Sequence, residues 1–156
     1  MSAPRLPLFH ETVRPEWIDY NGHMSEAFYV LVFGFATDAL MERTGMDAEY
    51  RKRTGCSMYT VESHVRYLRD VPEGARLAVR TRVLGAAGKK ARFTHEMYVG
   101  TEPAADAEPV ATIELLALHV DQEAGRATPF PGAVRERLTA LAEQAPSWAG
   151  RSIAAP

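Results

Sequence analysis

The chain has 156 residues, of which 46% are hydrophobic and 24% are charged, and its formal net charge is -2. This length supports one well-buried core, and the composition excludes a chain that is disordered throughout. The near-neutral charge excludes a global attraction to nucleic acid or to an anionic membrane surface, so neither is expected as a partner.

One cysteine and the lack of a long apolar run indicate the compartment. Cys56 has no second cysteine in the chain to pair with, so nothing suggests an oxidising environment. We interpret it as a small, partly buried thiol rather than a nucleophile. The longest apolar run is far shorter than the ~18 residues that a membrane-spanning helix needs. We therefore expect a cytoplasmic protein.

In chain order, the sequence first predicts an N-terminal arm and a short strand. The arm, residues 1–8, contains two prolines, and the alternating segment from Phe9 to Arg14 then predicts a strand that Pro15 ends. A polar turn with the sequence Asp-Tyr-Asn-Gly-His occupies residues 19–23.

A long apolar helix follows the turn directly. It is predicted from Ser25 to Thr44, with Gly45 as the residue just beyond its C-terminus. Residues 27–36 are all apolar or glycine, so the helix has no polar face. Such a helix must be covered on most sides, and a curved antiparallel sheet is the obvious cover.

Four strands with no long helix between them are predicted next. They lie at Ser57–Arg69, Arg76–Leu84, Lys90–Val99 and Val110–Val120. In the first, the alternation places Tyr59, Val61, Val65 and Tyr67 on one face. The link at residues 85–89 has the glycines of a hairpin, and a closing helix fits Pro131–Gln144.

This order of elements predicts an α+β fold. A curved antiparallel sheet of about five strands wraps around a long buried helix, and a short C-terminal helix follows. We expect a single domain at residues 9–144, between the N-terminal arm at 1–8 and a C-terminal tail at 145–156.

Two motifs resemble those of a known family, the hotdog-fold acyl-CoA thioesterases of the 4-hydroxybenzoyl-CoA thioesterase-like superfamily. Asp19-x-Asn21-Gly22-His23-Met24 followed by Tyr29 is similar to the D-x-N-x-H-V-N-N-x-x-Y signature of that family, and residues 65–74 resemble a second strand motif. Ser25-Glu26 and Asp70-Val71 depart from the two patterns. The resemblance covers roughly residues 9–141 and implies the hotdog fold, with two subunits joined edge to edge.

A narrower resemblance concerns the substrate. The runs PEWIDYNGHMSEAFYV, AVRTRVLG and LHVD are similar to the thioesterases associated with L-carnitine dehydrogenase, which act on betainyl-CoA. This implies an enzyme that hydrolyses a small acyl-CoA thioester, with betainyl-CoA as one candidate. Coenzyme A is then part of the substrate, and no separate cofactor is expected.

Thioester hydrolysis needs a group that takes the proton of water and donors that stabilise the oxyanion. Asp19 is the only carboxylate inside the first motif, so we expect it to be the general base or a nucleophile that forms an anhydride. Asn21 is expected to orient the water or this carboxylate, and His23 to donate to the thioester oxygen or to assist proton transfer. The oxyanion hole is expected at the backbone N–H groups of Gly22, His23 and Met24. Each residue alone also has a structural interpretation as a turn or helix-entry residue, but together they favour catalysis.

Further candidates have stronger structural alternatives. Glu62 is a candidate catalytic residue supplied across a dimer, although a solvated strand face would also explain it. Four aromatic side chains are candidates for binding a quaternary ammonium substrate, although core packing is the commoner role: Trp17, Tyr20, Tyr29 and Tyr59. Three basic residues near the hairpin are candidates for contacts with the CoA phosphates: Lys89, Lys90 and Arg92. The five histidines show no metal-ligand spacing, so no metal site is expected.

Two other functions stay open. Hotdog hydratases resemble D-x-N-P-x-H, whereas only Gly22 separates Asn21 from His23 here, which favours hydrolysis. A non-catalytic acyl-CoA-binding module would keep the pocket without needing Asp19. A homodimer is expected because the sheet edge would otherwise be exposed, and a tetramer of two dimers stays open.

Overall fold

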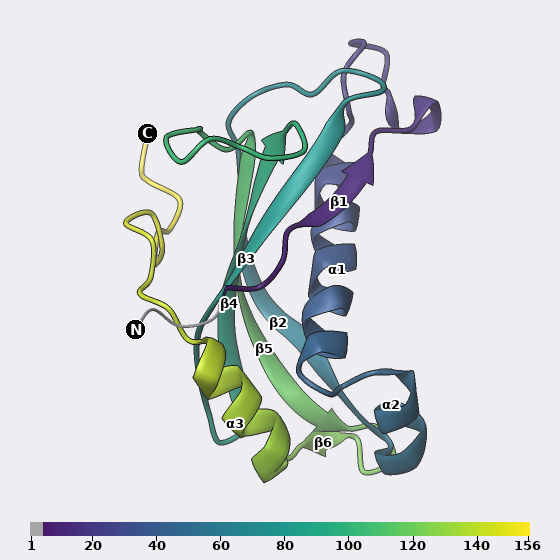
Figure 1. Ribbon diagram of the computed structural model, residues 1–156, viewed down its shortest axis with the longest axis vertical. Coiled ribbons are helices and arrows are strands. Elements are labelled where there is room, and N and C mark those ends of the chain that lie inside the picture. Colours follow the sequence, from purple (N-terminus) through teal and green to yellow (C-terminus); the bar gives the residue numbers. More distant parts are fainter. Residues whose placement is uncertain (1–4) are drawn as a thin grey trace.

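The computed structural model in Figure 1 describes residues 5–156. A long helix and one antiparallel sheet organise the chain, which confirms the α+β prediction. The predicted N-terminal arm, residues 1–8, lies partly outside the described residues; within them, Leu6 packs against the core. The elements are β1 (Phe9–Thr12), η1 (Pro15–Trp17), α1 (Glu26–Arg43), α2 (Ala48–Thr54), β2 (Cys56–Tyr67), β3 (Arg76–Ala87), β4 (Lys90–Val99), β5 (Ala111–Asp121), β6 (Arg126–Ala127) and α3 (Gly132–Leu141).

The sheet curls around α1, as the sequence predicts (Figure 1). Its strand order is β1-β3-β4-β5-β2, with β6 paired to β5, and all pairs are antiparallel. The two-residue strand β6 has no sequence signal long enough to predict it. β2 is an edge strand of 12 residues, so the backbone groups on its outer side have no partner strand within residues 5–156.

The ends of α1 follow from its flanking residues. Ser25 is extended, with φ -64° and ψ 146°, and the helix begins at the next residue. Gly45 has φ +91°, a left-handed conformation that glycine adopts at little cost, and it ends the helix after Thr44. The prediction of Ser25–Thr44 therefore differs from the structure by one residue at each end.

The prediction that α1 is covered on most sides is wrong for the single chain. The face of α1 that packs on the sheet is buried through Val32, Phe33, Ala36 and Leu40. A stripe on the opposite side stays exposed, because one curved sheet covers only one side of a helix: Ala27, Val30, Leu31 and Gly34.

A bulge in β2 changes which residues face the core. Val61 has no partner, because the register shifts between Thr60 and Glu62. Tyr59 lies opposite Leu118 and Val65 opposite Ile113, and since these β5 residues are five apart they face opposite sides of the sheet. The predicted common face of Tyr59, Val61, Val65 and Tyr67 is therefore wrong.

The β3–β4 hairpin is tighter than predicted. The expected link at residues 85–89 is mostly strand, since β3 continues to Ala87 through a bulge at Leu84. The turn consists of Gly88 and Lys89, and Gly88 has φ +60°. This hairpin lies at the same end of the sheet as α3. The first turn of α1 lies at the other end (Figure 1).

The C-terminal segment covers the outer face of the sheet, which is the face away from α1. Helix α3 packs on β3 there, and the Glu143 N–H donates to the Val83 carbonyl at 2.8 Å (Figure 1). The chain then continues as the predicted tail, whose Gly150 N–H donates to Glu114 Oε1 at 2.7 Å. Within residues 5–156 no helix has the length and apolar character to cross a bilayer.

Candidate active site

The polar turn that precedes α1 is held by its own hydrogen bonds. The Gly22 N–H donates to the Asp19 carbonyl oxygen at 3.0 Å, and the Asp19 N–H donates to the His23 carbonyl oxygen at 3.0 Å. The Asn21 N–H donates to Asp19 Oδ1 at 2.9 Å, which fixes the carboxylate over the turn. Gly22 has φ +80°, a conformation that side-chain-bearing residues rarely adopt.

Two further hydrogen bonds fix the turn to the rest of the fold. The Met24 N–H donates to the Val71 carbonyl oxygen at 2.8 Å, and the Ser25 N–H donates to the Trp17 carbonyl oxygen at 2.9 Å. The turn is thus held between η1 and the β2–β3 connection. Asp19 is half-buried at this position, at the N-terminal end of α1.

These hydrogen bonds correct the predicted oxyanion donors. The N–H groups of Gly22 and Met24 already have acceptors, so neither is available to a substrate. Of the three predicted donors, only the His23 N–H has no acceptor among residues 5–156. Sequence reasoning could name the segment but not its hydrogen bonds.

The first turn of α1 supplies free donors instead. The Ser25 side chain makes no capping hydrogen bond, and within the described residues the N–H groups of Glu26 and Ala27 have no acceptor. The first N–H groups of a helix have no intrahelical partner and lie at its positive end. An oxyanion placed there would meet two donors that nothing else uses.

Tyr29 joins α1 to the end of β2. Its side chain is buried, and its hydroxyl donates to the Arg69 carbonyl oxygen at 3.0 Å. Its ring meets the Tyr67 ring edge-on, with centroids 5.2 Å apart and an interplanar angle of 90°. Burial raises the pKa of Tyr29, and the negative charges of Asp70 and Asp19 raise it further, so both carboxylates lie close to this tyrosine.

His23 and Asn21 lie at the surface of the same site. His23 Nδ1 is 3.9 Å from Asp70 Oδ2, and about half of the His23 side chain is exposed. The Asn21 side chain is exposed and makes no hydrogen bond within residues 5–156. The structure therefore brings the predicted residues Asp19, Asn21 and His23 together, and it adds Asp70 as a neighbour.

A pocket of about 390 Å³ opens where α1 begins and β2 ends. It is lined by the side chains of seven residues: Met24, Glu26, Tyr29, Tyr67, Leu68, Arg69 and Asp70. Its size is within the range of small-ligand sites. Sequence reasoning missed Glu26, Tyr67 and Asp70 as site residues, although Glu26 lies within the first motif and Tyr67 and Asp70 lie within the second.

The other predicted aromatic residues do not line this pocket. Trp17 is a core residue, 4% exposed, whose ring stacks on Phe28 at 5.5 Å. Tyr20 is 98% exposed, because it lies at the tip of the turn. Tyr59 lies near the other end of β2, where its hydroxyl accepts a hydrogen bond from Gln122 Nε2 at 2.6 Å. Of the four aromatic residues predicted to bind substrate, only Tyr29 is at the site of this chain.

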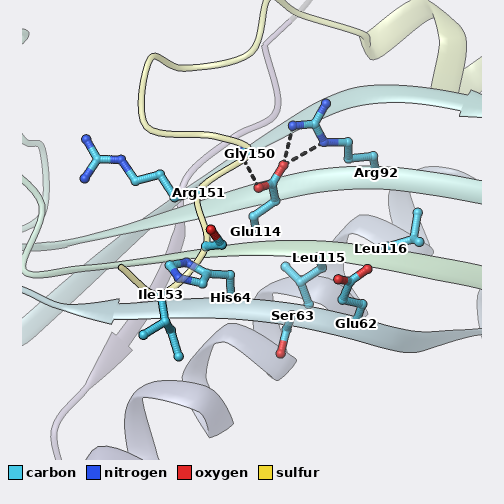
Figure 2. A pocket seen from close by; sticks show the side chains of 11 residues that line it. Glu62, Ser63, His64, Arg92, Glu114, Leu115, Leu116, Gly150, Arg151 and Ile153 are labelled. Atoms are coloured by element: carbon cyan, nitrogen blue, oxygen red, sulfur yellow. Dashed lines mark hydrogen bonds and ion pairs between the residues drawn. The ribbon is translucent and has the colours of Figure 1, made fainter. Parts of the chain in front are cut away.

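Glu62 lies in a different pocket, on the outer face of the sheet. Figure 2 shows it with His64, Arg92 and Glu114 around a cavity of about 630 Å³ that the C-terminal tail borders. Arg92 Nε donates to Glu114 Oε2 at 2.6 Å, so its charge is already paired. Glu62 and Arg92 thus line the same pocket, and within one chain the sheet separates both of them from Asp19.

The basic residues Lys89 and Lys90 also lie away from Asp19. Lys89 is in the β3–β4 turn, and Lys90 is opposite Leu118 of β5, at the end of the sheet remote from the first turn of α1 (Figure 1). Both are exposed. A single chain does not bring them to the pocket.

No metal site accompanies these residues. Within the part of the chain that the structure describes, no group of three or more His, Cys, Asp or Glu side chains is arranged to hold a metal ion. The buried His95 serves the core instead, with Nε2 2.8 Å from Thr37 Oγ1 and Nδ1 2.7 Å from Thr81 Oγ1.

Comparisons with known proteins find relatives along nearly the whole chain. The profile of the thioesterase-like superfamily matches residues 13–138. Betainyl-CoA thioesterase from Pseudomonas aeruginosa PAO1 is 41% identical over 97% of this chain and 96% of its own length. L-carnitine dehydrogenase/betainyl-CoA thioesterase from Agrobacterium fabrum is 44% identical over 96% of this chain, which spans only 31% of that longer protein.

Solved structures give the same fold. A candidate thioesterase from Pseudomonas putida KT2440 is 36% identical, with a TM-score of 0.81 over 99% of both chains. A Staphylococcus aureus protein solved in complex with CoA has a TM-score of 0.86 over 100% of this chain and 98% of its own. At 21% identity, the second likeness concerns the fold alone.

Proposed function

Because the chain belongs to the thioesterase-like superfamily, we propose that it hydrolyses an acyl-CoA thioester to the free acid and CoA. The proposed substrate is betainyl-CoA, the compound in the names of the Pseudomonas aeruginosa and Agrobacterium fabrum relatives. The observation that carries the proposal is the position of Asp19, whose carboxylate is fixed by the Asn21 N–H beside the first turn of α1.

Asp19 acts as the general base. Its Oδ1 accepts the Asn21 N–H, and its Oδ2 has no donor among the described residues, so Oδ2 is available to a water molecule. The carboxylate takes one proton from the water while the water oxygen attacks the carbonyl carbon of the thioester. General base catalysis of this kind typically contributes about 10²–10⁴ in rate. His23, at the edge of the same site, assists the proton transfers.

The first turn of α1 stabilises the intermediate. The attack places negative charge on the former carbonyl oxygen, and the N–H groups of Glu26 and Ala27 donate to it. When the intermediate collapses, the carbon–sulfur bond breaks and its electron pair leaves on the CoA sulfur. The thiolate then takes up the proton that Asp19 received.

A nucleophilic route uses the same residues. Asp19 would attack the carbonyl carbon itself and release CoA, and water would hydrolyse the resulting anhydride. A single turnover in ¹⁸O-labelled water detects the nucleophilic route when water attacks the Asp19 carbonyl of the anhydride. ¹⁸O then enters the Asp19 carboxylate and the first product carries an unlabelled Asp19 oxygen, which the general-base route never gives.

A homodimer is proposed because the chain leaves two adjoining apolar surfaces uncovered. The free edge of β2 exposes Val61 and Leu68, and α1 exposes Val30 and Leu31, each at 40% or more of its surface. Exposed strand edges invite pairing with a second strand, and apolar surface of this kind favours association. A two-fold axis that pairs β2 with its copy would extend the sheet and cover both surfaces.

This dimer also suggests a role for the predicted residues that lie away from Asp19. Two copies of β2 related by a two-fold axis run antiparallel, so the end of one sheet that carries Lys89, Lys90 and Tyr59 approaches the Asp19 end of the other. We therefore keep the basic residues as candidates for binding CoA phosphates across the interface. Pairing of two dimers through the outer face is left open.

The proposed domain is residues 9–144, and a cytoplasmic location stays a prediction. The family profile covers residues 13–138, which agrees with one catalytic domain. The N-terminal arm and the C-terminal tail lie outside this range.

The test measures release of the free thiol of CoA from a panel of acyl-CoA thioesters that includes betainyl-CoA. We expect thiol release with one thiol per substrate consumed. Consumption of an enoyl-CoA without thiol release would instead support the hydratase. Tight binding of acyl-CoA without turnover would support a non-catalytic binding module.

A further inference from the structure

We infer that the 390 Å³ pocket beside the Asp19 turn is a subsite for a quaternary ammonium group in the acyl part of the substrate, formed by the rings of Tyr29 and Tyr67 and the carboxylates of Glu26 and Asp70. The inference rests on the proposed thioesterase function. It adds to that function the residues that bind the cationic end of the acyl group and select it.

The aromatic part of the subsite is a pair of perpendicular rings. The half-exposed Tyr67 and the buried Tyr29 both line the pocket, and their rings are perpendicular, with centroids 5.2 Å apart. A quaternary ammonium group has no N–H to donate, so it cannot use ordinary hydrogen bonds. The faces of aromatic rings are the surfaces that bind such a cation best.

Two carboxylates add negative charge to the same pocket. Glu26 raises the pKa of the Tyr67 hydroxyl, after the larger effect of burial, and Asp70 does the same for Tyr29. Each carboxylate therefore lies within electrostatic reach of one ring. The Tyr67 hydroxyl also contacts the Glu26 carbonyl oxygen, at 3.4 Å, so the ring is tied to the first turn of α1.

The cationic side chains near the pocket leave this negative charge available. Arg69 is the only arginine or lysine among the lining residues, and its Nη2 lies 3.1 Å from Glu108 Oε2. Among residues 5–156, the one basic side chain paired with either carboxylate is that of His23, whose Nδ1 lies 3.9 Å from Asp70 Oδ2. The pocket therefore holds more negative than positive charge, which favours a cationic ligand over an anionic one.

The position of the pocket fits a short cationic acyl group. In a trimethylammonioacetyl thioester the nitrogen is about 2.5 Å from the carbonyl carbon, as ordinary bond lengths and angles require. The cation must therefore bind directly beside the catalytic groups. Met24, which directly follows the Asp19–His23 turn, and Glu26, which carries one of the proposed oxyanion donors, both line the pocket, so the subsite and the reacting carbonyl are neighbours.

The experiment compares two substrates of nearly the same shape, of which one is cationic. Because the ammonium group also activates the thioester carbonyl, the change of the kcat/KM ratio in the variants below is what isolates cation binding. Betainyl-CoA carries a trimethylammonium group, and 3,3-dimethylbutyryl-CoA carries a tert-butyl group of nearly the same shape with carbon in place of nitrogen. We expect the full-length protein to hydrolyse betainyl-CoA with a kcat/KM at least tenfold higher. A charge pair at about 4 Å in water corresponds to roughly fivefold in affinity, and two carboxylates act here.

Matched variants identify the groups responsible. Asp70→Asn and Glu26→Gln remove one charge each without changing shape, and each is expected to lower the ratio of the two kcat/KM values about fivefold. Tyr67→Leu should lower the ratio, whereas Tyr67→Phe, which keeps the ring, should retain it. Asp106→Asn, an exposed aspartate in the β4–β5 loop, is the control and should keep the wild-type ratio.

The outcomes separate this inference from the proposed function. Hydrolysis of both substrates with equal kcat/KM overturns the cation subsite and leaves the thioesterase in place. If Asp70→Asn lowers kcat/KM equally for both substrates, the cation subsite is also overturned, because Asp70 would then act through His23. Failure to release thiol from any acyl-CoA removes the proposed function itself.

Discussion

The main-chain N–H of Met24 donates to the carbonyl oxygen of Val71 at 2.8 Å, and this bond decides which groups can act as oxyanion donors. It ties the Asp19–His23 turn to the β2–β3 connection and removes Met24 from the set of free donors. Among residues 5–156, the candidate donors whose N–H groups stay free are then His23, Glu26 and Ala27, of which the last two lie at the start of α1.

Glu26→Pro tests this assignment because it removes one donor and keeps the helix. Proline is well tolerated at the first position of a helix, and Ser25 already has the extended conformation, φ -64° and ψ 146°, that a residue before proline prefers. We expect kcat about 10²–10³ lower than that of Glu26→Ala, which lacks the same side chain but retains the N–H. Equal kcat values in the two variants, with both folded by circular dichroism, would place the oxyanion elsewhere.

Asp19→Asn tests the general base. Asparagine keeps an oxygen that can accept the Asn21 N–H, so the turn is expected to persist, but an amide cannot take the proton of water. We expect kcat for thiol release to fall by about 10²–10⁴, with the midpoint of urea unfolding nearly unchanged. Asp106→Asn is the control for charge. Turnover close to that of wild type would mean that another group, such as Asp70, is the base.

Val61→Asp tests the dimer at the free edge of β2. Val61 is the bulged residue of this edge and is 52% exposed in the single chain. The variant would carry one carboxylate on each copy of β2. Pairing of the two strands would remove water from both carboxylates and bring the two like charges together across the two-fold axis. We expect wild type to sediment at twice the 17.3 kDa of one chain and the variant to sediment as a monomer with lower activity.

A valine of similar exposure provides the control for this experiment. Val99, at the end of β4, is 49% exposed and lies away from the β2 edge, so Val99→Asp should remain a dimer. A wild-type protein that stays monomeric at all concentrations would contradict the proposed interface.

The long helix and the thioesterase family were predictable because their signals are local. Ser25 and Gly45 flank an unbroken apolar segment, and the motif from Asp19 to Tyr29 occupies one continuous stretch. The family and the fold are both confirmed. Signals of this kind come from neighbouring residues, because particular residue types indicate where a helix begins and ends.

Features that depend on strand register were not predictable. A single bulged residue, Val61, reverses which side of the sheet Tyr59 faces, and nothing in the alternation of β2 reveals it. The same limit explains why Asp70 was missed. Its proximity to Tyr29 depends on how a connection 41 residues further along the chain returns to the start of α1, and the hydrogen bond from Tyr29 to the Arg69 carbonyl oxygen is what fixes it.

The exposed stripe on α1 explains why the predicted cover of this helix was not found in the single chain. An apolar helix does need cover on most sides, yet the chain's own sheet covers only one. The sequence rule and the structure agree if a second copy supplies the rest, and Val30 and Leu31 mark the surface that it would cover.

The buried His95 gives a prediction about acid stability. Burial lowers the pKa of this histidine from 6.5 to about 3, so it stays neutral in the folded protein. The Thr37 hydroxyl donates to the Phe33 carbonyl oxygen, and it therefore accepts from His95 Nε2–H, while Nδ1 accepts from Thr81. The unfolded chain binds a proton below pH 6.5 that the folded chain does not bind until about pH 3.

The free energy of unfolding should therefore be unaffected by His95 above pH 6.5 and should fall as the pH drops from 6.5 towards 3. Between pH 6.5 and pH 4.5 this residue accounts for about 2–3 kcal/mol of lost stability. His95→Gln keeps one donor and one acceptor for the two threonines but does not titrate, so urea unfolding should show a correspondingly shallower pH dependence. His10→Gln, at an exposed position on β1, should leave the dependence as in wild type. Parallel pH curves for wild type and His95→Gln would mean that His95 is protonated in the folded protein as readily as in the unfolded chain.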